Sequence, residues 1–215
     1  MMTLREWQQA AKSRTSVIFS CSPKDGSDSW LPFPIGIACY FNNYSGTLVS
    51  AQIGTHENTL LCAIKTSTDA LRRRVGINRR IIAETLGRNG IPNTLVGRNE
   101  YFQTLPTYKF VISPEGNGVD CHRHCEALMA GCIPIIERHP GIEEKYEGCP
   151  ILWTTDYSEI TEDYLNLVYA DMLDKEYNFS KLNVFTYPQE IQEQIRSNGN
   201  YWGTFRTGIA WYDYP

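Results

Sequence analysis

Long apolar runs are missing from this sequence of 215 residues. It contains no stretch of about twenty consecutive apolar residues, which a membrane-spanning helix needs. Its first residues also lack the charged and then apolar pattern of a secretory signal. The sequence therefore predicts a cytoplasmic protein without a membrane span.

An excess of positive charge is also missing, because the formal net charge at pH 7 is −4. Arginines are densest at Arg72–Arg74 with Arg79 and Arg80, inside a segment that is predicted to be helical rather than on a tail. This balance argues against a nucleic-acid partner. We find no internal repeat, low-complexity segment or linker.

The cysteines do not suggest disulfides, since their number is seven and three of them share the apolar stripe of one predicted helix. They are expected to be reduced core residues. Cys121, His122, His124 and Cys125 are also a possible zinc set. On a helix, however, these four side chains point in different directions, so a structural or metal-binding domain is the less favoured interpretation.

What the sequence does contain is an alternation of strand-like and helix-like segments. Thr59–Lys65 is a continuous apolar run, typical of a buried parallel strand, and Asp69–Leu86 has a helical pattern with Asp69 as its N-cap and Leu71, Val75, Ile82 and Leu86 on one stripe. The other predicted helices are Thr3–Lys12, Asn99–Leu105, Gly141–Tyr146 and Thr161–Leu173, and the other predicted strands include Ser16–Cys21, Thr94–Gly97 and Pro150–Trp153. The pattern predicts an α/β fold with a Rossmann-like, doubly wound parallel sheet whose ligand lies at the carboxyl ends of the strands.

The segment Tyr108–Ile136 has the layout of a phosphate-binding crossover: a strand, a glycine-rich turn, a short helix and a strand. Gly116, Asn117 and Gly118 allow a tight turn that brings the backbone close to a ligand. The following helix presents unpaired N–H groups to an anion, and Asp120 is its expected N-cap. Ser113 and Glu115 flank the turn at the predicted carboxyl end of the strand.

On a helical wheel, this helix separates into two faces. Cys121, Cys125, Leu128 and Cys132 form an apolar stripe, and Arg123, Glu126, Ala127 and Ala130 lie opposite. Arg123 suits a phosphate and Glu126 suits a ribose diol, with small neighbours that admit a ligand. The alternative is an exposed salt bridge between residues three apart, and the preceding glycine turn favours the binding face.

These residues resemble the signature of exostosin-like glycosyltransferases of the GT-B class and, more distantly, of fucosyltransferase-like enzymes. The resemblance covers about thirty residues and rests on Gly116-Asn117-Gly118, Arg123-His124-Cys125-Glu126-Ala127-Leu128 and Gly131-Cys132-Ile133-Pro134. It implies a GT-B donor-binding lobe for a nucleotide sugar, with Arg123 near the diphosphate and Glu126 near the ribose. UDP is favoured over GDP by the resemblance alone.

The same resemblance implies an arginine near the start of the preceding helix, and Arg72 is the aligned residue. Arginines in a first helical turn oppose the helix dipole, which hints at a bound phosphate. For Arg73 and Arg74, a solvated basic face is an equally good interpretation.

The chain departs from the family pattern at its amino-terminal side. Residues 55–215 suffice for one nucleotide-sugar-binding lobe, whereas residues 1–54 are too few for a complete acceptor lobe. A general base is therefore hard to assign: Asp25, Asp28 and His56 are candidates, and Asp28 is the one we select, although aspartates in such a stretch are often turn formers.

The sequence thus predicts a glycosyltransferase that moves a sugar from a nucleoside-diphosphate sugar to a glycan hydroxyl, with inversion implied by the resemblance. It has no Asp-x-Asp or Glu-x-Asp triplet to hold a metal against the diphosphate, so no metal is expected and arginines are expected to neutralise the charge. The alternative is a non-catalytic nucleotide-sugar-binding module of a larger protein.

Overall fold

The computed structural model describes residues 1–12, 33–36 and 52–193. The predicted strand Ser16–Cys21 and the candidate bases Asp25 and Asp28 lie outside these residues. The division of the chain at residue 54 stays a prediction.

Four parallel strands form the described sheet: β1 (Asn58–Leu61), β2 (Tyr108–Ile112), β3 (Ile133–Glu137) and β4 (Leu152–Thr154). In the register, Phe110 of β2 lies between Leu60 of β1 and Ile133 of β3. The strands follow one another in chain order, from β1 at one edge to β4 at the other. The predicted α/β fold with a parallel sheet is confirmed, while the described strands do not include the reversal of order that marks a doubly wound sheet.

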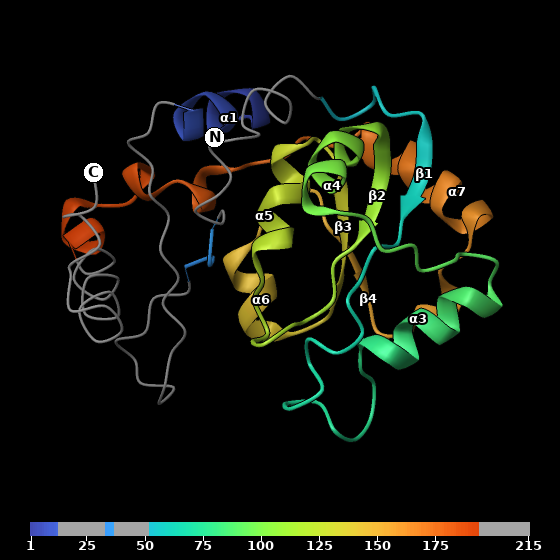
Figure 1. Ribbon diagram of the computed structural model, residues 1–215. Coiled ribbons are helices and arrows are strands. Elements are labelled where there is room, and N and C mark those ends of the chain that lie inside the picture. The colour runs from blue at the N-terminus through green and yellow to red at the C-terminus, as the bar shows by residue number, and fades with distance from the viewer. Residues whose placement is uncertain (13–32, 37–51, 194–215) are drawn as a thin grey trace.

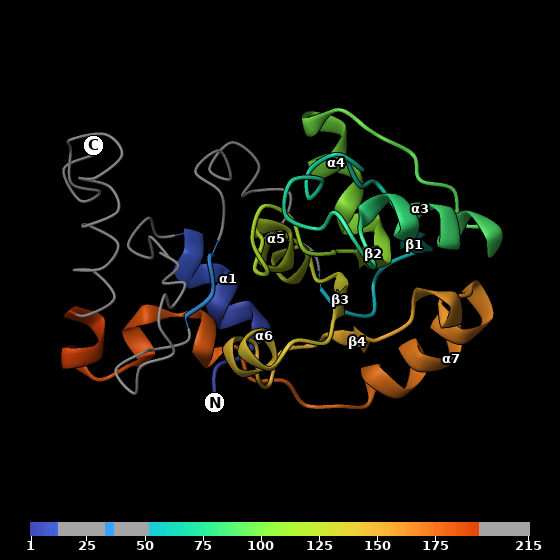
Figure 2. The same ribbon diagram turned by 90° about the horizontal axis from the view of Figure 1, so that it is seen from below.

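Helices cover both faces of the sheet (Figures 1 and 2). On one face lie α1 (Leu4–Lys12), α4 (Arg98–Thr104), α5 (His122–Met129) and α6 (Pro140–Lys145), and on the other lie α3 (Arg79–Arg88) and α7 (Glu162–Leu173). Short 3-10 turns cover Leu105–Thr107, Tyr157–Glu159, Ser180–Leu182 and Val184–Thr186.

Successive residues of β2 face opposite cores, as strand geometry requires. Val111 packs with α1, α4 and α5, whereas Phe110 and Ile112 pack with α3 and α7. All three are fully buried. Cover on both faces explains why the second part of β2, Phe110–Ile112, is continuously apolar.

The predicted helix over Asp69–Leu86 is wrong in its first half. Helix α3 begins at Arg79 with Asn78 as its N-cap, and residues 66–78, which we call the arginine loop, form a series of turns. Two features stop a helix there: Gly76 has a φ of +77°, and the Asp69 carboxylate accepts the backbone N–H of Arg79 at 2.9 Å. Leu71 and Val75, expected on the buried stripe, are 85% and 91% exposed.

Other boundaries follow local capping chemistry. Thr3 and Glu6 exchange hydrogen bonds in a capping box at the start of α1, and the Thr161 hydroxyl accepts the backbone N–H of Tyr164 at the start of α7. The helix predicted near Asn99 is present as α4, whereas Thr94–Gly97 is not a strand. Among the residues described, no helix combines the length and the apolar character needed to cross a membrane.

Candidate functional site

Three connections meet at the carboxyl edge of the sheet, where ligands of parallel α/β sheets bind. The chain leaves β1 toward the arginine loop, it leaves β2 through Ser113–Gly118, and β3 ends at Glu137. The glycine turn and the arginine loop are thus neighbours in space although about 40 residues separate them in sequence.

Arg72 and Arg79 both bind the backbone of residues 113–118, which we call the glycine turn. The Nε of Arg72 donates to the carbonyl of Gly116 at 3.2 Å, and its guanidinium also contacts the Glu115 carboxylate. Arg79 donates from Nε to the carbonyl of Glu115 at 2.6 Å and from Nη2 to that of Pro114 at 2.9 Å. A Cβ atom on Gly116 would lie 3.2 Å from the Arg79 Nη2, so the missing side chain makes room for this guanidinium.

Arg73 holds the arginine loop to the end of β3. Its guanidinium forms a bidentate pair with the Glu137 carboxylate, at 3.0 and 2.5 Å. Glu137 also accepts the backbone N–H of Glu115 at 3.2 Å, so one carboxylate joins the loop, the turn and the strand. Burial acts to lower the pKa of Arg73, but the hydrogen bond and charge of Glu137, followed by the charges of Glu115 and Asp69, outweigh it and raise this pKa.

Arg79 differs from its neighbours because no described carboxylate forms an ion pair with its buried guanidinium. Burial lowers the pKa of Arg79, and the nearby positive charge of Arg123 lowers it further. The charge of Glu126 favours the charged form of Arg123, whereas the pKa of Arg79 remains lowered, so an anion beside Arg79 would favour its charged form. Arg79 is not among the site residues that the sequence predicts, although its place in an arginine-rich stretch is a signal for such a role.

Arg123 and Glu126 do not lie on an open surface. Arg123 donates to the carbonyl of Ile112 at 3.3 Å and its guanidinium lies 5.2 Å from the centre of the Tyr101 ring. Glu126 is 4% exposed, and Ala127 and Ala130 are fully buried.

The expectation of an accessible face on α5 is therefore wrong. A helical wheel assumes one solvent face, but α5 is packed between the sheet and α1, where the Gln8 amide donates to the carbonyl of Met129 at 2.8 Å. Arg123 still reaches the carboxyl end of β2, next to the glycine turn, whereas Glu126 is covered.

Asp120 is not the N-cap of α5, as the sequence analysis expected. Cys121 occupies that position without a side-chain cap bond. The Asp120 carboxylate instead accepts hydrogen bonds from the Tyr146 hydroxyl at 2.9 Å, the Lys145 ammonium at 3.2 Å and the backbone N–H of Ile35 at 2.9 Å. The buried ammonium group of Lys145 attracts this carboxylate more strongly than a helix end does. Asp120 therefore holds parts of the fold together and does not cap α5.

Ser113 is fully buried as well, and its hydroxyl lies 2.7 Å from the Nδ1 of the buried His124. Asn117 is exposed at the tip of the turn, which is closed by a hydrogen bond of 2.9 Å from the N–H of Gly116 to the carbonyl of Gly118. Of the predicted residues, Arg72, Glu115, Gly116, Asn117, Gly118 and Arg123 gather at the carboxyl edge, and Ser113, Asp120 and Glu126 are buried behind it.

His56 lies at the opposite edge of the sheet. It lies two residues before the start of β1, and its Nε2 lies 3.0 Å from the carbonyl of Ala130, shortly before β3 begins. Since the arginines gather at the carboxyl edge, His56 is not placed to act as their general base.

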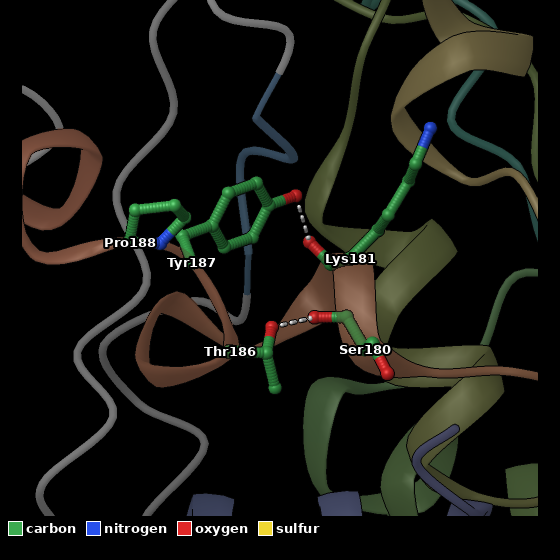
Figure 3. A pocket seen from close by; sticks show the side chains of 5 residues that line it. All are labelled: Ser180, Lys181, Thr186, Tyr187 and Pro188. Carbon is green, nitrogen blue, oxygen red and sulfur yellow. Dashed lines mark hydrogen bonds between the residues drawn. The ribbon is translucent and has the colours of Figure 1, made fainter.

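A shallow pocket of about 180 Å³ lies elsewhere, lined by Ser180, Lys181, Thr186, Tyr187 and Pro188 (Figure 3). Its polar groups are used internally, because the Tyr187 hydroxyl donates to the carbonyl of Lys181 and the Thr186 hydroxyl to that of Ser180. Figure 3 shows the Lys181 side chain directed away from the other lining groups. Its ammonium group donates to the carbonyl of Glu144 and to the carboxylate of Glu147. We assign no ligand to this pocket.

Within the described ranges, no three His, Cys, Asp or Glu side chains are grouped as a metal site requires. No family model matches this chain, and the search of characterised proteins found none with significant sequence similarity, so the site must be interpreted from its own residues.

Proposed function

We propose that this chain binds the diphosphate of a nucleotide sugar at the carboxyl ends of β1, β2 and β3 and acts as the donor-binding part of a glycosyltransferase. The observation that carries this proposal is the convergence of Arg72 and Arg79 on the glycine turn, with Arg123 beside Arg79. Guanidinium groups match phosphate oxygens in shape and charge, and ligands of parallel sheets bind at this edge.

In this proposal the arginines have a catalytic as well as a binding role. Transfer breaks the bond between the anomeric carbon and the diphosphate, and the leaving group gains negative charge. Arg72 and Arg79, preorganised by backbone carbonyls, stabilise that charge without a metal ion. The acceptor hydroxyl of a glycan attacks the anomeric carbon from the opposite face, with inversion, and gives its proton to a general base, for which Asp28 stays the prediction from the sequence. The role of ribose ligand is not assigned to Glu126, because its carboxylate is buried.

The carboxylate of Glu115 occupies the position beside Arg72 for which the proposed diphosphate would compete. It contacts Arg72 and lies 3.7 Å from Arg73. A diphosphate carries more charge than one carboxylate, and it would compete with Glu115 for Arg72. We therefore expect donor binding to weaken as salt concentration rises.

The test is a calorimetric titration of the protein with UDP, GDP and their sugars. Arg79→Gln and Arg72→Gln are expected to weaken nucleotide binding by about 1.5–3 kcal/mol each, the usual value of a hydrogen bond to a charged group. Arg80→Gln is the matched control, because this neighbouring side chain is 74% exposed and lies 3.9 Å from Glu84 of its own helix. Thermal unfolding of each variant separates lost binding from lost structure.

Equal affinities of all three variants would contradict the proposal, as would the absence of nucleotide binding by the native chain. Release of UDP from a UDP-sugar in the presence of candidate glycans then separates a transferase from a binding module. A non-catalytic module binds the nucleotide with the same dependence on Arg79 and releases no sugar.

A further inference from the structure

The arginine loop and the start of α3 carry an unusual surface. Three apolar side chains are exposed there: Leu71 by 85%, Val75 by 91% and Ile77 by 39%. The exposed Arg74 lies between Leu71 and Val75 in sequence, and the exposed Arg80 follows Ile77 by three residues. We call these five residues the basic apolar patch. Figure 1 shows the arginine loop projecting from the body of the molecule beside α3.

The charge of this stretch is opposite to that of the whole chain. Residues 70–83 contain five arginines and no acidic residue, whereas the chain has a net charge of −4. Three of these arginines are used inside the molecule, by Glu115, Glu137 and the backbone of the glycine turn. Arg74 makes no hydrogen bond or ion pair with any described residue, and Arg80 lies 3.9 Å from Glu84 with its side chain 74% exposed.

The exposure of the apolar side chains is imposed by the anchoring of the loop. Arg73 donates to the carbonyl of Ile77 at 2.7 Å and holds Glu137 at the same time, so the backbone closes around this one side chain. Leu71 and Val75 are consequently directed outward, where water contact costs free energy. Clustered exposed apolar residues mark surfaces of interaction.

We propose that the basic apolar patch docks this protein on the surface of an anionic lipid bilayer. A projecting loop can place leucine and valine side chains at the boundary between headgroups and acyl chains, while Arg74 and Arg80 meet the lipid phosphates. A protein partner fits less well, because the patch has no aromatic residue, the type most enriched in protein interfaces. This inference stands independently of the proposed function.

The experiment is co-sedimentation with two kinds of vesicle: phosphatidylcholine alone, and phosphatidylcholine in which about a third of the lipid is phosphatidylglycerol. The native chain is expected to sediment with the anionic vesicles at least about tenfold more strongly than with the neutral ones, and less so as salt is added. Leu71→Ser with Val75→Ser, and separately Arg74→Gln with Arg80→Gln, are expected to lower the bound fraction severalfold.

Matched controls use exposed residues far from the patch. Leu95→Ser with Leu167→Ser removes two side chains that are 64% and 75% exposed, and this variant is expected to bind vesicles like the native chain. Equal binding to both kinds of vesicle, or native binding by the two patch variants, would overturn the inference. Sedimentation velocity without lipid tests whether the patch binds a second copy of the chain. Self-association that is lost in the variant with Leu71→Ser and Val75→Ser would overturn the membrane proposal in favour of that alternative.

Discussion

At the scale of single residues, one side-chain type does different work at nearby positions. Arg73 is a structural clamp on Glu137, Arg79 is buried against backbone carbonyls, and Arg74 extends into solvent. The sequence alone does not separate these roles, because all three belong to one basic stretch. Partners supplied by β3 and by the glycine turn make the difference, and those partners are distant in sequence.

His56 gives a prediction about pH. Burial lowers the pKa of His56 below 6.5, and the Ala130 carbonyl offsets this only in part. Above about pH 6.5 the folded and unfolded chains both carry a neutral His56. As the pH falls below that value, the unfolded chain takes up a proton that the folded chain does not, so the free energy of unfolding decreases until the pH reaches the folded pKa.

Urea unfolding between about pH 7 and about pH 5 measures this effect. His56→Gln is expected to reduce the loss of stability by up to about 1.4 kcal/mol per pH unit, the value for one proton. The exposed His139 provides the control, and His139→Gln should leave the native slope in place. If His56→Gln leaves the change of the unfolding free energy with pH as it is in the native protein, another titrating group causes the pH dependence.

At the scale of elements, capping residues define where the helices begin. The Asn78 side chain accepts the backbone N–H groups of Arg80 and Ile81, both at 3.1 Å, and this cap sets the start of α3 at the next residue, Arg79. The position of Arg79 against the glycine turn depends on this boundary. The hydrophobic pattern predicts one helix over residues 69–86 and so does not indicate the helix start at Arg79, which positions this arginine at the site.

Replacing this cap tests its contribution. Asn78→Ala is expected to lower the free energy of unfolding by about 1–2 kcal/mol, because two N–H groups at the helix end lose their acceptor. Asn78→Asp keeps an acceptor and should stay close to the native stability. Chemical denaturation of the three proteins makes the comparison, and equal losses in both variants would mean that the amide group has another role.

Element types were largely predictable from the sequence, and their exact limits less so. The apolar runs at β1 and β2 and the capped starts of α1 and α7 are local signals, so they were recognised. The failure at residues 69–78 has a tertiary cause: Asp69 and Arg73 find partners outside the segment, at Arg79 and Glu137, that outweigh its helical pattern.

At the scale of the whole molecule, Asp120 connects three segments that are far apart in sequence: residues 33–36, the start of α5 and the end of α6. Its partner Lys145 is only 3% exposed. Asp120→Ala would leave this ammonium group buried without its carboxylate, and an expected loss of about 3–5 kcal/mol in the free energy of unfolding follows.

The matched control is an ion pair at the surface. Asp171 pairs with Lys175 at 2.5 Å with both side chains more than half exposed, and Asp171→Ala should change stability by less than about 1 kcal/mol. Thermal and urea unfolding of both variants measure the difference. Similar small losses in the two variants would contradict the structural role of Asp120.

The candidate site was predictable only in outline. The parallel sheet and the glycine turn located it at a carboxyl edge, where Arg72 and Gly116 indeed meet. Sequence patterns did not indicate that Ser113, Asp120 and Glu126 are buried. The burial of α5 depends on α1, whose Gln8 binds the carbonyl of Met129, and on Gln52 and Ile53, which lie against Gly131 just after the helix; all are more than seventy positions away in the chain.

The docking of α1 also has a consequence for biosynthesis. Trp7 stacks on Phe179 with ring centres 5.6 Å apart, and the backbone N–H of Phe179 donates to the carbonyl of Met2. A ribosome makes α1 before it makes the sheet, and the partner of Trp7 leaves the exit tunnel only after all four described strands have been translated. Until then the nascent chain carries a tryptophan without its stacking partner, which is the condition under which chaperones bind.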